Sequence, residues 1–481
     1  MKQKIFVKTY TLLLLIVLFG MFLRLIFFSG MGISDSLAYS KTANDINEGR
    51  GIDPNSTLTL STRLGLIFPT SLSYRLLGIN DFSSVIFVLL TSIGSVILVF
   101  YFGKLLFNEK IGLMAAFLLS FFPLDVVYAT KLTSDLPSAF FMALGVYIFL
   151  YAEMKCKMKY GVSYLFSGIF VGIGYLIRES TLLIALFFIV YIACKRRVKK
   201  EYFLVPLGVL IIFILEAIIF LNVTGDPFYR IHISQRYLVE SIAQHNYFGR
   251  LDFPTGLFHY PWLFLTNNLL VYFYTPIFIA LAYFIIKKKK STYIMMMWMV
   301  PLLLYLSFGS ASLAQYIPIL AKDRYTAIVT MPAILLLSYF FSEKNFVKNK
   351  ITSLALILLL LVSIGTVYLR EDRNLLGDLR QVYPVLEKLG RTIYIDSRSL
   401  QALNYISEFE NRLELKEYPE DLTHLKNAYA VINRHMIRNL KEANENLIFP
   451  DEIENIPKEW EIIKEMGEIE EDEIIIYYIN K

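Results

Sequence analysis

The strongest constraint on this chain is a series of apolar segments, each long enough to cross the hydrocarbon core of a bilayer. A helix needs roughly 20 apolar residues for one crossing. Of the 481 residues, 56% are hydrophobic and only 18% are charged, whereas soluble domains carry about 25% charged residues. Lipid is therefore the expected solvent for most of the chain. The candidate spans are 9–28, 82–102, 111–130, 136–152, 161–177, 181–194, 201–222, 262–286, 291–308, 325–341 and 351–369.

Basic clusters between these spans predict the orientation of the chain. The runs Lys195–Lys200 and Lys287–Lys290 are the densest, and all the basic clusters fall on one side of the predicted spans. Cytoplasmic loops are enriched in Lys and Arg, so the N-terminus is expected to be cytoplasmic. The first span lacks a small-residue cleavage site and is expected to stay uncleaved. Cys156 and Cys194 then lie at cytoplasmic helix ends, and no disulfide framework is predicted.

The composition changes after the last span, and this change predicts two domains. Residues 1–369 form the predicted transmembrane domain, and residues 370–481, rich in Glu and Lys, contain no spanning run. Short strands are expected at Thr392–Asp396, Ala428–Asn433 and Glu473–Ile479. The predicted fold is a polytopic α-helical membrane protein of about eleven transmembrane helices with a small C-terminal α/β extracytoplasmic domain. The composition of the tail favours a prokaryotic plasma membrane.

Several classes of function find no support in the sequence. The net charge of +6 reflects helix-end clusters, whereas a nucleic-acid partner would require a continuous basic face. The five histidines are scattered, and no metal ligands are assigned. A phosphate-binding P-loop and a dinucleotide fingerprint are both missing from the sequence.

The first outer loop, residues 29–81, carries a carboxylate soon after the first span. Asp35 opens the segment Asp35–Tyr39 (DSLAY). An Asp just before a helix commonly caps its free amide groups. A carboxylate facing a water-accessible cavity can also act as a general base. Spacing alone leaves both interpretations open.

The second outer loop, residues 123–135, contains Asp125, Lys131 and Asp135. Asp135 precedes Leu136-Pro137 and has the form of an N-cap, with Pro in the first helical turn. Ionisable groups this close to a bilayer are usually paired or functional. A capping role and a site role therefore both remain open for Asp135.

Four further charged positions lie on, or toward, the same face. Arg178 and Glu179 interrupt an apolar hairpin at its outer tip, either as an ion pair or as ligands. Arg324 begins the tenth span, where a lone Arg commonly snorkels to the interface, although a third basic group on this face also suits a site. Glu216 lies inside the seventh span without an obvious partner, so it is either functional or hydrogen-bonded to a neighbouring helix.

Five motifs occur in a fixed order along the outer loops and helix ends. They are Asp35–Tyr39, Phe68–Asn80, Phe122–Leu136, Gly172–Glu179 and Arg324–Pro332. This order resembles the GT-C clan of integral-membrane glycosyltransferases, and is most similar to the dolichyl-phosphate-mannose–protein mannosyltransferases and the bacterial enzymes that modify lipid A with aminoarabinose. Ser36 stands where that family usually has a second acidic residue, which leaves Asp35 to act alone.

The resemblance implies a reaction and a role for each candidate residue. The reaction is an inverting transfer of a hexosyl or pentosyl group from a polyprenyl-phosphate or dolichyl-phosphate donor to a protein, glycan or lipid acceptor. Asp35 is then the catalytic base. No cofactor is assigned, and a divalent metal ion is left open. The expected donor-phosphate ligands are Lys131, Arg178 and Arg324, and the expected acceptor or supporting residues are Asp135, Tyr39, Glu179, Lys322 and Tyr325.

Two other classes of protein compete with a glycosyltransferase. A transporter or flippase of lipid-linked sugars also needs polar groups at membrane depth, but such proteins usually show inverted repeats and midplane sites, which this sequence lacks. An assembly subunit that kept the fold and lost activity is the second alternative, and Ser36 is its best support.

Overall fold

The computed structural model describes residues 2–54, 59–155, 160–243, 255–311, 316–343, 350–370, 375–410, 412–422, 424–443, 449–466 and 474–480. Contacts divide the chain into two compact units. Unit 1 comprises Met1–Gly30 and Asp45–Glu371, and unit 2 comprises Met31–Asn44 and Asp372–Lys481. Unit 2 is thus built from two stretches that are far apart in the sequence.

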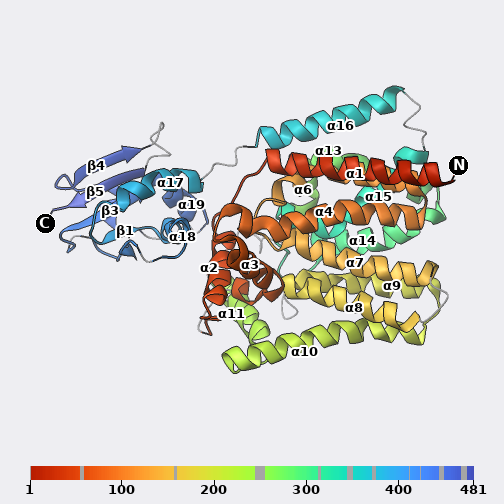
Figure 1. Cartoon of the computed structure of the whole chain (residues 1–481), viewed down its shortest axis with the longest axis horizontal. Coiled ribbons are helices and arrows are strands. Elements are labelled where there is room, and N and C mark those ends of the chain that lie inside the picture. The colour runs from red at the N-terminus through yellow and green to blue at the C-terminus, as the bar shows by residue number, and fades with distance from the viewer. Residues whose placement is uncertain are drawn as a thin grey trace. The chain divides into compact units, whose positions relative to one another are not determined.

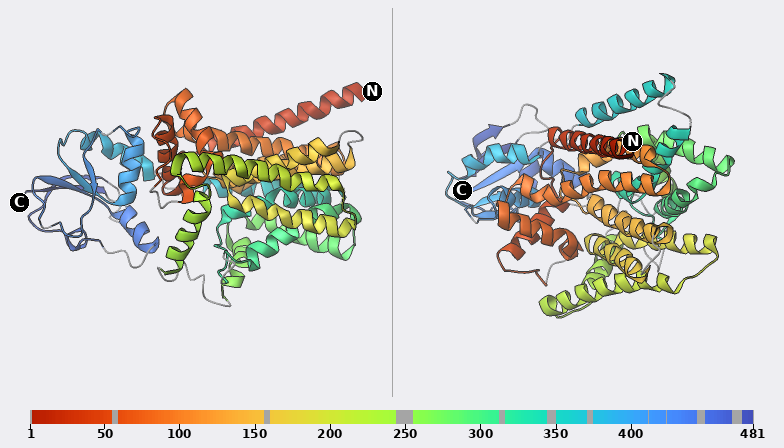
Figure 2. Two further views of the ribbon diagram at one scale, coloured as in Figure 1. Left: turned by 90° about the horizontal axis from the view of Figure 1, so that it is seen from below. Right: turned by 45° about the vertical axis from the view of Figure 1, so that its right-hand side comes forward.

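Unit 1 is a bundle of helices, many of which run side by side (Figures 1 and 2). Its α-helices are α1 (Lys2–Ile26), α3 (Leu64–Leu77), α4 (Asp81–Leu106), α5 (Glu109–Ser120), α6 (Pro123–Tyr128), α7 (Asp135–Met154), α8 (Tyr160–Ile177), α9 (Ala185–Lys195), α10 (Leu204–Thr224), α11 (Tyr229–Ala243), α12 (His259–Thr266), α13 (Val271–Ile286), α14 (Tyr293–Phe308), α15 (Ala327–Glu343) and α16 (Lys350–Tyr368). Short 3-10 helices join them: η1 (Thr59–Thr62), η2 (Glu179–Ile184), η3 (Lys200–Phe203), η5 (Thr255–Phe258), η6 (Lys290–Thr292) and η7 (Asp323–Thr326). Helix α2 (Asp35–Asn47) begins in unit 2 and ends in unit 1.

Among the residues that the structure describes, six helices are long and apolar enough to cross a membrane. A seventh span results if α12 and α13, which meet at an angle of 107°, are counted as one. Two further apolar helices, Gly161–Ile177 and Ser353–Tyr368, are shorter. The expectation of a mostly helical chain with several apolar helices and a small sheet is confirmed, whereas the count of about eleven spans stays a prediction.

One predicted span, 111–130, is not a continuous helix. Helix α5 ends at Ser120, and α6 starts anew at Pro123. Phe122 between them has an extended backbone with a ψ of 119°, a conformation that the following proline ring favours over the helical one. The break leaves the chain free to turn before the second outer loop.

Helices α8 and α10 pack closely enough to exclude side chains at their contact. A Cβ atom at Gly168 would overlap the carbonyl oxygen of Val205, and one at Gly208 would overlap that of Leu165. Small residues permit such close approach of helices in membrane proteins. The two helices therefore run in a fixed register, which continues about two turns further to Tyr175 and Glu216.

Unit 2 contains a five-stranded sheet with the strand order β2-β1-β3-β5-β4. Strand β1 (Ile393–Ile395) pairs in parallel with β2 (Leu415–Glu417) and β3 (Ala428–Asn433), while β5 (Ile474–Ile479) is antiparallel to β3 and to β4 (Glu461–Met466). The three predicted strands correspond to β1, β3 and β5. The helices of this unit are α17 (Leu375–Leu386), α18 (Ser397–Ile406), α19 (Arg434–Ala443) and α20 (Asp451–Glu454).

Candidate functional site

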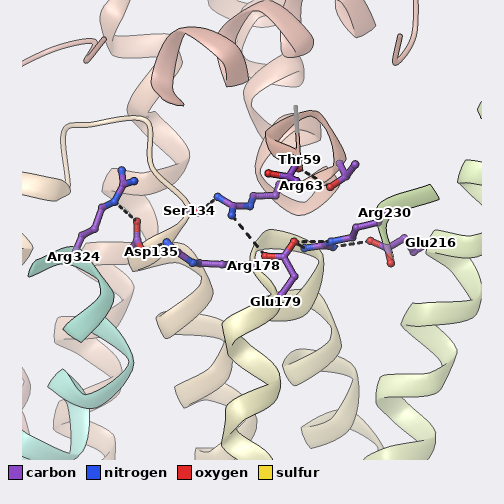
Figure 3. Close-up of polar contacts among 10 residues, drawn as sticks. Thr59, Arg63, Ser134, Asp135, Arg178, Glu179, Glu216, Arg230 and Arg324 are labelled. Atoms are coloured by element: carbon purple, nitrogen blue, oxygen red, sulfur yellow. Dashed lines mark hydrogen bonds and ion pairs between the residues drawn. The ribbon is translucent and has the colours of Figure 1, made fainter. Parts of the chain in front are cut away.

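The central feature of unit 1 is a buried carboxylate between two guanidinium groups (Figure 3). Asp135 begins α7, Arg178 follows α8, and Arg324 lies in η7. Arg178 Nη1 donates to Asp135 Oδ1, and Arg324 Nε lies 3.5 Å from Asp135 Oδ2. The Asp135 side chain is only 4% exposed, and a buried charge needs such partners to offset its desolvation.

This arrangement settles how the start of α7 is built. Ser134 occupies the N-cap position, without a side-chain capping bond, and Asp135 directs its carboxylate to the arginines instead. The sequence left an N-cap role open for Asp135, but in the structure Asp135 is the first residue of α7 and not its N-cap. Three of the residues expected at the site, Asp135, Arg178 and Arg324, are brought together from distant parts of the sequence.

Tyr325 completes this group through its ring. The Arg178 guanidinium carbon lies 4.1 Å from the ring centroid, and that of Arg324 lies 5.8 Å away. A guanidinium stacked on an aromatic face keeps its edge donors available for a ligand. Lys322 stands at the N-cap position of η7, two residues before Arg324.

Lys131 belongs to a neighbouring cluster around Tyr128. Its Nζ lies 5.9 Å from the Tyr128 ring centroid, and the Arg370 guanidinium carbon lies 5.6 Å from the same ring. The Tyr128 hydroxyl donates to Asp323 Oδ1 at 2.8 Å, and the same oxygen accepts from the Arg324 backbone N–H at 2.7 Å. Lys131 is thus linked to the start of η7 but is not among the residues that line the cavity of unit 1.

Glu179, next to Arg178 in sequence, is the carboxylate of a second group. Its Oε1 accepts from Arg230 Nη2 at 2.6 Å and from Arg230 Nε at 2.9 Å, and its Oε2 lies 3.6 Å from Arg63 Nη2. Arg63 Nη1 also donates to Ser134 Oγ at 3.0 Å, and this bond joins the two groups. Burial alone would raise the pKa of Glu179. The positive charges of Arg230 and Arg63 have the larger combined effect and lower the pKa to about 2.

Glu216, whose role remained open in the sequence, has two partners in the structure. Arg230 Nη1 donates to Oε1 at 2.7 Å, and the Tyr175 hydroxyl donates to Oε2 at 2.8 Å. The Arg230 guanidinium carbon also lies 4.5 Å from the centroid of the Tyr175 ring. The bond to Tyr175 of α8 is the hydrogen bond to a neighbouring helix that was one of the two alternatives.

Arg63 and Arg230 were missed at the sequence level. Arg63 lies in a loop at the start of α3, and Arg230 lies in the first turn of α11, which α10 reaches through the left-handed Gly225. A search for a cation near Glu216 on the outer side of α10 could have found Arg230. Arg63 gave no comparable signal, because its partners come from distant loops.

A cavity of about 350 Å³ lies beside Asp135, Arg178 and Arg324. Glu179 and Tyr325 also line it, and its apolar wall consists of Leu182, Leu183, Leu306, Ile319, Ala327 and Ile328. The volume falls in the range of small-molecule sites. Cationic groups together with an apolar wall suit an anionic group on an apolar carrier, because guanidinium forks match phosphate oxygens.

The remaining two expected site residues, Asp35 and Tyr39, lie in the stretch of unit 2 near the N-terminus. Asp35 is the first residue of α2 and is partly exposed, whereas Tyr39 is buried. Burial lowers the pKa of Arg398 in unit 2, whereas the negative charges of Asp396 and Asp35 raise it. Asp35 therefore lies close enough to Arg398 for their charges to interact. The roles expected for Asp35 and Tyr39 stay predictions.

The possible divalent metal ion stays a prediction. In the part of the chain that the structure describes, no group of three or more His, Cys, Asp or Glu side chains is placed to hold one. The carboxylates of Asp135, Glu179 and Glu216 face guanidinium groups instead.

Comparisons with known proteins agree with this architecture. Residues 66–220 match the family model described as dolichyl-phosphate-mannose-protein mannosyltransferase. ArnT from Cupriavidus metallidurans in the apo state superposes with a TM-score of 0.61 at 12% identity, covering 97% of each chain. The same protein bound to undecaprenyl phosphate gives 0.56 at 12% identity, again over 97% of each chain.

A third structure is the archaeal oligosaccharyltransferase AglB from Archaeoglobus fulgidus, in complex with an inhibitory peptide and a dolichol-phosphate. It gives a TM-score of 0.55 at 12% identity, covering 89% of this chain and 70% of that one. A comparison with curated proteins finds no match. The chain has the fold of the GT-C integral-membrane glycosyltransferases, so the resemblance expected from its motifs is confirmed.

Proposed function

We propose that this protein is an inverting glycosyltransferase that takes its sugar from a polyprenyl-phosphate donor at the outer face of the membrane. The observation that carries the proposal is the cavity of unit 1, in which Arg178 and Arg324 meet an apolar wall. A lipid-linked phosphate needs cations for its phosphate group and an apolar surface for its chain, side by side. The acceptor is a protein, a glycan or a lipid.

The phosphate of the donor would lie against Arg178 and Arg324. Asp135 holds both guanidinium groups before the donor arrives, so little reorganisation is needed when charge develops. As the bond between the anomeric carbon and the phosphate oxygen breaks, the departing lipid phosphate gains negative charge. Fixed cations in a site shielded from water stabilise such charge strongly. Lys131 and Lys322 would add positive potential from the neighbouring loops.

Asp35 would act as the general base. It takes the proton of the acceptor hydroxyl while the acceptor oxygen attacks the anomeric carbon from the face opposite the phosphate. A positioned base of this kind contributes typically about 10²–10⁴-fold. One displacement inverts the anomeric centre. Tyr39, Glu179 and Tyr325 would orient the acceptor or support the charged groups.

The test is transfer from a radiolabelled polyprenyl-phosphate sugar by the purified full chain. Asp35→Asn should keep membrane expression and lose transfer by about 10²-fold or more. The matched control is Asp45→Asn on the same helix, whose carboxylate pairs with the exposed Arg50 and whose loss should leave transfer unchanged. Near-normal turnover of Asp35→Asn would exclude the base assignment.

We also propose about eleven crossings in a prokaryotic plasma membrane, with the N-terminus cytoplasmic and residues 370–481 outside. Cys194 is exposed at the end of α9, on the predicted cytoplasmic side. In a Cys156→Ser background, a membrane-impermeant maleimide should label Cys194 only after permeabilisation. Lys416→Cys in unit 2, with Cys194 also replaced, should be labelled in intact cells. The reverse pattern would overturn the orientation.

A transporter or flippase of lipid-linked sugars is the alternative function. The similarity to ArnT, AglB and the mannosyltransferase family model favours an enzyme. Movement of a lipid-linked sugar across sealed vesicles without any transfer to an acceptor would support the alternative.

A further inference from the structure

The short helix α6 of unit 1 is buried along its whole length, and polar contacts hold both of its ends. It packs against α1, α5, α16 and the 3-10 helix η7. Asp125 lies in its first turn, and Tyr128 is its last residue. The function proposed above assigns no role to either side chain, although η7 contains Arg324 of the proposed donor site.

Asp125 fixes the first turn of α6 to the helical bundle. Its Oδ1 accepts from Ser92 Oγ at 3.3 Å, and Ser92 Oγ accepts in turn from Arg24 Nε at 2.8 Å. Arg24 Nη1 also donates to the carbonyl oxygens of Gly20 and Ser120, at 2.9 Å each. The side chains of Arg24, Ser92 and Asp125 are all buried. Leaving buried polar groups without their partners is costly, so α6 is held firmly against α1 and α4.

The other end of α6 holds the turn that contains Arg324. The Tyr128 hydroxyl donates to Asp323 Oδ1 at 2.8 Å, and the same oxygen accepts from the Arg324 backbone N–H at 2.7 Å. Thr326 Oγ1 closes the turn by donating to the Asp323 carbonyl oxygen at 2.7 Å. Hydrogen bonds to a carboxylate are roughly twice as strong as those between neutral groups. The Asp323 carboxylate thus joins α6 to the backbone from which the Arg324 side chain extends.

The position of that backbone matters for the cavity of unit 1. Arg324 Nε lies 3.5 Å from Asp135 Oδ2 (Figure 3), and these two residues belong to separate elements, η7 and α7. A displacement of about 1 Å at a reaction centre can lower the rate by about 10²-fold. The contact between Tyr128 and Asp323 ties η7 to an anchored helix, and so limits such a displacement.

We propose that Tyr128 is a positioning residue, which sets the place of the Arg324 guanidinium through Asp323. The proposal rests on the proposed function, because Arg324 is the group that would bind the donor phosphate. The hydroxyl of Tyr128 carries this role, whereas its ring also lies near Lys131 and Arg370. A phenylalanine at this position keeps the ring and removes only the bond to Asp323.

Sugar transfer by the full chain, measured in a double-mutant cycle, tests the proposal. Tyr128→Phe should lower kcat/KM for the polyprenyl-phosphate sugar about tenfold, the effect of one hydrogen bond to a charged group. In an Arg324→Gln background the same substitution should cost less than about twofold, because the positioned group is already absent. An equal loss in both backgrounds, or no loss in either, overturns the proposal.

The matched control is Tyr151→Phe. It removes a hydroxyl from an exposed position in the last turn of α7, and kcat/KM should stay within about twofold of that of the unaltered chain.

A conservative variant of Asp323 separates the hydrogen bonds from the charge. Asp323→Ala loses the acceptor of both the Tyr128 hydroxyl and the Arg324 backbone N–H, and should cost at least as much as Tyr128→Phe. Asp323→Asn keeps an acceptor oxygen in the same place, and should restore most of the transfer that Asp323→Ala loses. Equal losses in the two variants would contradict a role through these bonds.

The structure of the Tyr128→Phe variant, determined by cryo-electron microscopy in lipid nanodiscs, separates this proposal from the proposed function. A displacement of the Arg324 guanidinium from Asp135 by about 1 Å or more supports the positioning role even if the chain transfers no sugar. An unchanged distance between Arg324 Nε and Asp135 Oδ2 overturns that role and leaves the proposed function intact. The absence of transfer by the unaltered chain would instead refute the proposed function.

Discussion

The two units place their ion pairs in different surroundings. In unit 1, the guanidinium groups lie within ion-pair distance of buried or partly buried carboxylates, as the chain of contacts from Arg324 to Glu216 shows (Figure 3). In unit 2, Lys441 pairs with Glu454, and both of these side chains are largely exposed. Position relative to solvent explains the difference.

Arg230 has a side chain only 3% exposed, whereas Lys441 is 42% exposed. A buried charge that loses its partner is costly, while an exposed charge is solvated by water. The ion pairs of unit 1 therefore offset the cost of burying these charges, and Arg178 and Arg324 also line the cavity. The exposed Lys441–Glu454 pair of unit 2 therefore contributes little to folding.

The largest expected effect comes from removing Arg230. Arg230→Met strands the buried Glu216 carboxylate and should cost about 3–5 kcal/mol of stability, the range for breaking a buried pair. The measurement is reversible unfolding in mixed detergent micelles. Arg236→Met on the exposed side of the same helix should change stability by less than about 0.5 kcal/mol.

A double variant tests whether the cost comes from the stranded charge. Adding Glu216→Gln to Arg230→Met removes that charge and should recover part of the loss, so the two substitutions will not be additive. Strict additivity would mean that the two residues do not interact in the folded protein.

The next effect concerns the donor. Arg324→Gln should lower kcat/KM for the polyprenyl-phosphate sugar by about 10²-fold or more, because one fixed cation at the leaving phosphate is lost. Membrane insertion should be unaffected. Arg75→Gln, an exposed arginine in the last turn of α3, is the control. An unchanged donor dependence of Arg324→Gln would remove Arg324 from the site.

The low pKa of Glu179 predicts a smaller effect, a loss of folding stability at acid pH. Its folded pKa of about 2 lies below the ordinary value of 4.5, so its stabilising contribution is complete above about pH 4.5 and is lost as the pH falls toward 2. Unfolding measured between pH 5 and 3 should show this loss, and Glu179→Gln should flatten it. The side chain is 40% exposed, which limits the size of the effect. An unchanged slope in the variant would contradict the assignment.

The smallest effect is expected at the exposed ion pair between Lys441 of α19 and Glu454 of α20. Lys441→Gln breaks an ion pair whose side chains are 42% and 51% exposed, and exposed pairs contribute about 0–1 kcal/mol. Thermal unfolding of unit 2 should shift by the equivalent of about 0.5 kcal/mol or less. A larger loss would show that Lys441 contributes to folding through contacts beyond this pair.

The sequence predicted the half of the unit 1 site that lies close to helix ends. Asp135, Arg178 and Arg324 each stand at the end of an apolar run, so their position along the run can be read from the sequence. Hydropathy also predicted a mostly helical chain with a small sheet near its C-terminus, but not that residues 31–44 belong to unit 2. These features depend on local composition, which a single sequence contains.

The other half depends on contacts between distant segments. Arg230 lies in a helix outside the spans, and its pairing with Glu179 joins residues 51 positions apart. Arg63 reaches Ser134 across 71 positions. Periodicity carries no information about such partners. The break before Pro123 was not predicted, because the long apolar run around it suggested a continuous span, and other prolines of the chain lie inside helices.

The contact between Gly168 and Gly208 has a consequence for how this protein can diverge. Each position excludes even a methyl group, so backbone geometry limits variation there, while the lipid-facing surface of the same helices stays open to exchange. Any substitution that separated the pair would swing Tyr175 away from Glu216 at the far end of the helices. Variation at Gly168 and Gly208 is thus limited by the helix contact itself, and that contact in turn keeps the Tyr175–Glu216 hydrogen bond in place.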